Sequence, residues 1–290
     1  MEETLKLTEK LPEAVYTPES QLRHPCQLMQ SMWYDLIASR ELAWRLFVRN
    51  ISAMYRQTML GYVWAFMPPI FTTLTFVFLN SQKIFTVGKT DIPYPAYVMI
   101  GTLLWQGFAD AMRSPLQVIN QSRSFLSKIN FPREALLLAG IGEVLFNFAI
   151  RLILMIIVFF WYKIPVPATV FWAPLGIFAM MAFGLMLGVL IVPIGVLYKD
   201  IEKGLPLIIG MWMLLTPVVY PPPTSWPASL LVGLNPVSPL LTTTREMITT
   251  GNLSQLTEFI GVFGATLGLL FIGWILYRLA LPHLIERISA

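Results

Sequence analysis

The sequence predicts an all-α integral membrane protein with six transmembrane helices. The chain of 290 residues is 56% hydrophobic, only 12% of its residues are charged, and its mean hydropathy is +0.66. Soluble domains carry charge on about a quarter of their residues. The apolar residues also gather in stretches of about 20, the length that a helix needs to cross the hydrocarbon core of a bilayer.

The chain opens on a polar segment, residues 1–30, which we predict to be a cytoplasmic tail. It lacks the basic start, short apolar run and small-residue cleavage site of a signal peptide. The single cysteine, Cys26, permits no intrachain disulfide, and His24 and His283 lie near opposite ends of the chain. We therefore expect no metal site and no cofactor in this chain.

The next segment, residues 31–58, is predicted to form an amphipathic helix along the cytoplasmic membrane interface. Apolar and arginine residues alternate in it at helical spacing, as in helices that lie on a bilayer surface. For any single arginine, contact with lipid phosphates is a sufficient explanation. Several arginines beside a glycine turn also suit a lipid head-group phosphate, which guanidinium groups and exposed backbone amides bind. This candidate site comprises Arg45, Arg49, Arg56, Leu60 and Gly61.

The domain that follows, residues 59–290, contains six apolar stretches long enough to span a membrane. Lysine and arginine favour the chain ends and the loops after the second and fourth spans. The positive-inside rule therefore places both termini in the cytoplasm. No internal duplication supports the repeat architecture of many secondary transporters. The predicted spans are 59–82, 94–116, 135–162, 168–197, 204–222 and 256–281.

A proline-rich stretch, TPVVYPPPTSWPASLLVGLNPVSPLL at residues 216–241, lies between the fifth and sixth spans on the outer side. Each proline removes a backbone donor, and irregular backbone is tolerated at membrane depth only where protein shields it or where it lines a cavity. Because the stretch is apolar and SLLVGL is too short to span, we predict short re-entrant helices. The alternative is a proline-rich extracellular loop.

Ionisable residues fall inside two predicted spans, where charge is costly and tends to mark function. Glu143, Asn147 and Arg151 recur every four residues on one stripe of the third span. We interpret them as a polar ladder that holds helices together, with sugar contact as the alternative. Asp110 and Arg113 are spaced for an ion pair in the second span.

Aromatic residues of the first and fifth spans are candidates for lining a glycan channel, because sugars slide over flat apolar rings. Any single one of them is better explained by an aromatic belt at the membrane interface. They are therefore informative only as a group. The candidates are Tyr62, Trp64, Phe66, Trp212 and Tyr220.

Two short cytoplasmic loops are candidate contacts for a partner protein. SRSFLSKINFPREA is predicted to form a short helix that ends before its proline, and YKDIEK is predicted to form a compact charged link. The alternative is that their positive charge only orients the chain in the membrane. The candidate contact residues are Arg123, Phe131, Arg133, Lys199 and Asp200.

Four motifs occur in order along the chain: SRELAWRLFVRN with YRQTMLGYVWAFMPP, INFPRE, LYKDIEKGLP, and TPVVYP with LNPVSPLL. Together they resemble the permease subunits of ABC transporters that export polysaccharides and polyol phosphates, namely the O-antigen, capsule and teichoic acid exporters. The likeness covers residues 33–285. Each motif alone is degenerate, whereas four in this order form a specific pattern.

The resemblance implies one half of a homodimer in the bacterial cytoplasmic (inner) membrane, paired with two copies of a cytoplasmic ATPase that binds ATP and magnesium. In that family the Leu-Gly turn, here Leu60-Gly61, lies where the lipid-linked pyrophosphate engages, and re-entrant helices cap the outer end of the channel. The ATP site is expected on the partner, because VGKT at 87–90 has Lys83 where a Walker A loop requires glycine.

We therefore expect a permease, and not an enzyme, that moves a lipid-linked polysaccharide of O-antigen or capsule type. Its expected partners are the ATPase, a second copy of itself, the glycan and membrane lipid, but no nucleic acid. Export of teichoic acid or of another polymer or lipid is the alternative within the family. An integral membrane transferase acting on a lipid-linked sugar is less favoured, because it needs clustered carboxylates or a histidine base at one membrane face.

Overall fold

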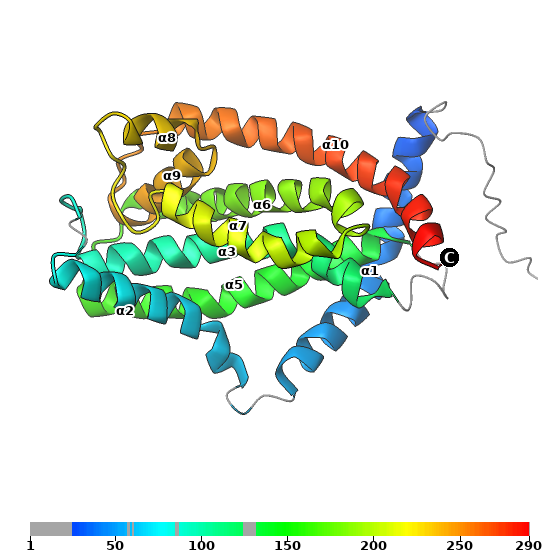
Figure 1. Ribbon diagram of the computed structural model, residues 1–290, viewed down its shortest axis with the longest axis horizontal. Helices are drawn as coiled ribbons and strands as arrows, with labels where there is room; N and C mark the ends of the chain where they lie inside the picture. The colour runs from blue at the N-terminus through cyan, green and yellow to red at the C-terminus, as the bar shows by residue number, and fades with distance from the viewer. Residues whose placement is uncertain (1–24, 57–58, 60, 85–86, 124–131, 290) are drawn as a thin grey trace, which may run out of the picture.

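The protein is seen here as a computed structural model that describes residues 25–56, 59, 61–84, 87–123 and 132–289 (Figure 1). No strand occurs in these ranges, so the all-helical fold class is confirmed for the described part of the chain. The elements are α1 (Pro25–Arg56), the 3-10 helix η2 (Gly61–Ala65), α2 (Met67–Ser81), α3 (Tyr94–Gln121), α5 (Glu134–Tyr162), the 3-10 helix η3 (Ala168–Trp172), α6 (Ala173–Gly195), α7 (Lys199–Leu215), α8 (Ala228–Leu234), α9 (Val237–Thr249) and α10 (Leu256–Ser289).

In the part of the chain that the structure describes, three segments are long and apolar enough to cross a membrane, judged by length and composition. They are α5, the continuous segment Ala168–Gly195 formed by η3 and α6, and α10 as far as Leu281. These segments match the predicted third, fourth and sixth spans to within a few residues. The chain is therefore a multi-pass membrane protein. Helices α2 and α7 are shorter, with 15 and 17 residues.

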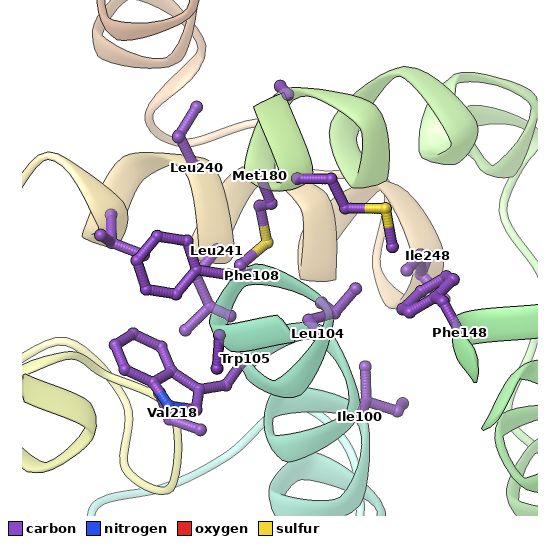
Figure 2. Close-up of a cluster of buried hydrophobic side chains, with 14 of the residues drawn as sticks. Ile100, Leu104, Trp105, Phe108, Phe148, Met180, Val218, Leu240, Leu241 and Ile248 are labelled. Carbon is purple, nitrogen blue, oxygen red and sulfur yellow. The ribbon is translucent and has the colours of Figure 1, made fainter. Parts of the chain in front are cut away.

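Helix α3 lies at the centre of the bundle, packed against α2, α5 and α6. Glycines let α6 approach it closely: a Cβ on Gly184 would collide with the carbonyl oxygen of Phe108, and one on Gly188 with the carbonyl oxygen of Met112. Small residues at helix contacts are typical of membrane bundles, where packing replaces the hydrophobic driving force. Figure 2 shows side chains of α3, α5, α6 and α9 meeting in one apolar cluster.

The predicted first span, 59–82, is interrupted near its start. The 3-10 helix η2 comes first, and the regular helix α2 begins only at Met67. Two prolines, Pro68 and Pro69, stand in the first turn of α2, where their missing backbone donors and fixed φ are tolerated. The pair sets the start of the helix.

The prediction of a charged link at YKDIEK was wrong, because these residues form the first turn of α7. Tyr198 is extended, the helix begins at Lys199, and Asp200 and Glu202 lie in its first turn. Acidic side chains there interact favourably with the positive end of the helix dipole. The helix also ends at Leu215, short of the predicted 222, because Thr216 before Pro217 adopts an extended conformation.

Helix α1 extends beyond the predicted interface helix 31–58 at its N-terminal end, where it begins at Pro25. Residues 1–24 of the predicted tail lie outside the described residues. Figure 1 shows α1 crossing the long helices steeply, near the end where the C-terminus lies. One face of α1 packs on α5, whereas Tyr34, Ile37 and Trp44 on other faces are exposed. The helix thus presents a broad apolar surface outward.

Two short helices, α8 and α9, occupy the proline-rich region between α7 and α10, as the sequence predicts. Every residue of α9 except Glu246 is buried. The helix contacts α3, α6, η3 and α10. The chain therefore turns back into the bundle at this end instead of forming an exposed loop.

Arg245 of α9 has a role that its sequence position does not reveal, because its hydrogen-bond partners lie 27 and 28 residues away along the chain. Its side chain is buried and donates hydrogen bonds from Nη1 and Nη2 to the Pro217 carbonyl oxygen at 3.1 and 3.0 Å. Nη2 also donates to the Val218 carbonyl oxygen at 2.7 Å, and the guanidinium carbon lies 3.9 Å from the centre of the Tyr97 ring. The carbonyls released where α7 ends are thereby satisfied.

A second clamp on the same stretch comes from Asn235. Its Nδ2 donates to Thr216 Oγ1 at 2.8 Å, while its Oδ1 accepts from Trp212 Nε1 at 3.1 Å. Gly101 of α3 makes room for the stretch, since a Cβ there would collide with the Val218 carbonyl oxygen. Buried side chains therefore stabilise the irregular backbone.

Replacing the buried guanidinium tests this account. We expect Arg245→Met to lower the free energy of unfolding by about 2–6 kcal/mol, because it leaves two buried carbonyls unpaired at about 1–3 kcal/mol each. Unfolding by sodium dodecyl sulfate in mixed micelles measures the change. The matched control, Arg45→Met, removes an exposed pair with Glu41 and is expected to change stability by less than about 1 kcal/mol. Equal effects of the two variants would contradict the account.

Candidate functional site

A polar cavity of about 320 Å³ lies between the end of α1, η2, α3 and α5. Met54, Trp64, Val118 and Val144 provide its apolar wall, with the small residues Gly61 and Ala65 beside them. The polar lining consists of Asp110, Arg113, Ser114, Gln117, Glu143, Asn147 and Arg151. The cavity thus combines the two groups of ionisable residues that the sequence places in separate spans.

Asp110 is the centre of the charged part of this cavity. Its Oδ1 accepts from Arg113 Nη2 at 2.7 Å, and its Oδ2 accepts from Arg151 Nη1 at 2.5 Å. The side chain of Arg151 is 10% exposed and that of Arg113 is 40% exposed. The predicted pair of Asp110 and Arg113 is confirmed, while Arg151 binds across to α3. A buried charge is tolerated where it is paired in this way.

Glu143 is held by α1 and not by Arg151. Its Oε1 accepts from Asn50 Nδ2 at 2.6 Å, and Asn50 Oδ1 accepts from Arg49 Nε and Nη2 at 3.1 and 2.9 Å. The polar residues predicted to form a ladder along α5 therefore bind two different helices: Arg151 binds α3 and Glu143 binds α1. Sequence reasoning missed Asn50, because a single amide in an amphipathic helix forms no recognisable pattern.

Gly61 is the first residue of η2, the element that follows α1 along the chain. Its φ of +49° lies in the left-handed region that favours glycine. A Cβ at this position would meet no atom within 4 Å. Glycine is therefore favoured at this position by its backbone conformation and not by crowding. Leu60, predicted beside it, lies outside the described residues.

The arginines predicted to bind a lipid phosphate lie on α1, outside the cavity wall. Arg45 donates from Nη2 to Glu41 Oε1 at 2.6 Å, with both side chains largely exposed. Arg56 ends the helix and is exposed. Spacings of four and seven residues put Arg45, Arg49 and Arg56 on one face of α1.

The predicted channel aromatics fall into two groups. Trp64 lines the cavity, the Tyr62 ring lies 6.1 Å from that of Phe146, and Phe66 precedes α2. Trp212 belongs to the bundle core, where its ring lies 5.6 Å from that of Phe108 in an edge-on contact. Tyr220 Oη donates to the Leu214 carbonyl oxygen at 2.9 Å.

The predicted partner-contact residues gather at the opposite end of the bundle from α8 and α9. Arg123 Nη2 donates to the Val196 carbonyl oxygen at 2.8 Å, and Asn120 Nδ2 donates to Glu202 Oε2 at 2.6 Å. Lys199 and Asp200 are exposed in the first turn of α7. The two candidate loops are thus tied to each other. Phe131 lies outside the described residues.

Arg278 links three helices at this same end, next to Arg133. It donates from Nη1 to Glu134 Oε1 of α5 at 2.7 Å and from Nη2 to Asp35 Oδ2 of α1 at 2.6 Å. The neighbouring Tyr277 Oη donates to the Arg133 carbonyl oxygen at 3.1 Å. Sequence reasoning missed these contacts, because Arg278 lies 144 and 243 residues from its two partners along the chain.

Within the described residues, no group of three or more histidine, cysteine, aspartate or glutamate side chains is placed to hold a metal ion.

The arrangement combines a multi-pass helical bundle, a polar cavity among its helices and charged loops at one end. This architecture is typical of a membrane transport protein, in which intramembrane polar groups line substrate pathways.

The profile of the ABC-2 type transporter family matches residues 41–249, from α1 to the end of α9, and the chain belongs to this family. It is similar to the O-antigen export system permease protein RfbA of Myxococcus xanthus, with 28% identity over 72% of this chain and 80% of the relative. The protein of the same name from Klebsiella pneumoniae is 21% identical over 80% of this chain and 91% of the relative.

The ion pair between α3 and α5 can be tested by a double-mutant cycle. Asp110→Asn is expected to cost about 3–5 kcal/mol of unfolding free energy, because it leaves Arg151 buried without a counter-charge. Adding Arg151→Met is expected to recover part of this loss, with a coupling of about 1 kcal/mol or more. The exposed substitution Lys199→Met serves as the control. Additive effects at Asp110 and Arg151, measured in mixed micelles, would rule out the pair as a stabilising contact.

Proposed function

We propose that the chain is the membrane-spanning subunit of an ATP-driven exporter that moves a lipid-linked polysaccharide across the bacterial cytoplasmic membrane. The observation that carries this proposal is the family match, together with relatives named as O-antigen export permeases that align over most of their length. The apolar bundle with its intramembrane polar cavity supports it.

In this proposal six spans cross the inner membrane: η2 with α2, α3, α5, η3 with α6, α7, and α10. Both termini lie in the cytoplasm, and α1 lies along the inner interface. The exposed aromatic residues of α1, among them Trp33 and Trp44, suit the head-group region, where aromatic rings are enriched. Helices α8 and α9 then form a lid at the outer end.

Two copies of the chain form the channel, and two copies of a cytoplasmic ATPase bind ATP and magnesium and supply the energy of ATP hydrolysis. Exposed apolar side chains on α2 and α7, such as Phe71, Phe78 and Met211, support contact between copies or with lipid. The channel aromatics are those predicted from the sequence, Tyr62, Trp64, Phe66, Trp212 and Tyr220.

The phosphate of the lipid-linked substrate engages the arginine face of α1 next to the Leu60-Gly61 turn. An exposed row of guanidinium groups attracts an anionic head group at the inner membrane surface. The Gly61 turn leaves open space beside its backbone. The cargo is of O-antigen or capsule type, with teichoic acid as the alternative polymer. A lipid-linked glycan and a teichoic acid precursor, compared as stimulators of ATP hydrolysis, separate these two cargoes.

We expect Arg49→Glu and Arg56→Glu each to lower export by about tenfold, the equivalent of one charge-assisted contact of about 1.4 kcal/mol. Gly61→Leu is expected to lower export as well, because its bulk fills the open space where the head group would lie. Leucine at position 61 costs about 1–2 kcal/mol of backbone strain, but its side chain enters open space, so the protein still folds. Surface polysaccharide is measured in cells that depend on the variant. The control is Arg40→Glu, an exposed residue on another face of α1. Normal export by all three variants would contradict the head-group site.

Contact with the ATPase is tested at Arg133 and Asp200. We expect Arg133→Ala and Asp200→Lys to weaken co-purification by about tenfold or to abolish substrate-stimulated hydrolysis, because charge at an interface sets partner recognition. Lys163→Ala, at the outer end of α5, is the matched control. If the complex forms and hydrolyses ATP normally with both variants, the partner surface lies elsewhere.

A further inference from the structure

We infer that the polar cavity beside Gly61 binds a neutral sugar ring of the exported glycan and not its phosphate. The inference rests on the proposed export function, and it assigns the cavity a ligand distinct from the one expected on the arginine face of α1. The charges, the hydrogen-bonding groups, the volume and the open side of the cavity all favour this ligand.

The charges of the cavity do not suit an anion. Arg113 and Arg151 both bind Asp110, which occupies one amine nitrogen of each guanidinium. Glu143 adds a second carboxylate to the lining. A phosphate would have to displace Asp110 from its arginines and approach two carboxylates at once. Like charges at close range are strongly unfavourable in a site of low dielectric constant.

The hydrogen-bonding groups do suit hydroxyls, each of which donates one bond and accepts others. Carboxylate acceptors, guanidinium donors, the amides of Gln117 and Asn147 and the hydroxyl of Ser114 stand around one space. Donors and acceptors thus stand side by side on the lining, as a ligand with several hydroxyls requires.

The shape and access of the cavity agree with this ligand. A volume of about 320 Å³ lies at the lower end of small-molecule pockets, which range from about 300 to 1,000 Å³, and suits one sugar ring. Trp64 at the wall is 55% exposed and offers the flat apolar surface on which sugars stack. Arg113 is more exposed than Arg151, so the wall that it forms with Trp64 is the open side.

Recognition then has two parts. The phosphate contacts the arginine face of α1, and the first sugar occupies the cavity, which Gly61 and Met54 line. Because the hydroxyl pattern differs between sugars, the cavity would select the sugar that stands next to the lipid phosphate.

Thiol protection tests the inference on the full chain in lipid nanodiscs. A Gln117→Cys reporter is placed in a Cys26→Ser chain, because Gln117 is exposed at the cavity wall. Maleimide labelling is followed with glucose, galactose, mannose, rhamnose, N-acetylglucosamine or inorganic pyrophosphate. We expect at least one neutral sugar to slow labelling by about tenfold and pyrophosphate to have no effect, as for a site that excludes anions.

Matched variants separate recognition from folding. Trp64→Ala and Glu143→Gln are expected to raise the protecting sugar concentration by about tenfold, the loss of about 1.4 kcal/mol of contact, whereas Trp64→Phe retains protection. In the native chain, labelling of Cys26 should be unaffected by any probe, since it lies 28 helical residues from Met54, about 42 Å along α1.

Protection by pyrophosphate, or no protection by any of the five sugars, would overturn the inference. Co-purification with the ATPase and ATP hydrolysis are measured on the same preparations. A working complex whose cavity ignores sugars refutes only this inference. A chain that forms no complex with an ATPase refutes the proposed function instead, whatever the cavity binds.

Discussion

Polar groups in a bilayer must find their partners within the protein, and this constraint shapes both ends and the middle of the bundle. At the end of the bundle where α8 and α9 lie, helix α7 stops before Pro217, and the carbonyls of Pro217 and Val218 would remain unpaired in hydrocarbon. Buried Arg245 bonds both of them from α9. Helix α9 therefore turns back into the bundle, where its guanidinium pairs the carbonyls of the broken backbone. Gly101 of α3 packs closely against the same contact, since a Cβ there would collide with the Val218 carbonyl oxygen and with Arg245 Nη2.

The same constraint explains the charges in the middle of the bundle. Asp110 accepts from two arginines, one on its own helix and one on α5, while Glu143 is bound by Asn50 of α1. These bonds join α1, α3 and α5 around a cavity that apolar packing would otherwise close. Polar pairing thus stabilises the helices and leaves a space with hydrogen-bonding capacity. This space suits a sugar, whereas the exposed arginines of α1 suit a phosphate.

At the other end, bonds between distant segments create a connected surface. Asn120 ties the end of α3 to the start of α7, Arg123 bonds the Val196 carbonyl oxygen at the end of α6, and Arg278 joins α10 to α1 and α5. These bonds connect the start of α5 to α1, the helix that carries the proposed head-group arginines. In an exporter driven by a cytoplasmic ATPase, such a connection would carry force from the partner surface to the substrate site.

The sequence by itself determined the all-helical membrane class, the family likeness, three of the spans and the short helices of the proline-rich region. These properties depend on composition, on stretch length and on local backbone chemistry, which are all readable along the chain. The pair of Asp110 and Arg113 was predictable for the same reason, since its partners are three residues apart on one helix. The sequence did not predict that helices begin at Met67 and Lys199, because proline placement and the helix dipole shift helix ends by several residues.

Only the tertiary structure decided which charges meet. Arg151 and Asp110 are 41 residues apart, and Asn50 and Glu143 are 93 residues apart. Helical periodicity tells which face a side chain occupies but not which neighbouring helix that face meets. Arg245 illustrates the limit most clearly: its charge suggests a loop, whereas its burial follows from carbonyls that another segment leaves unpaired.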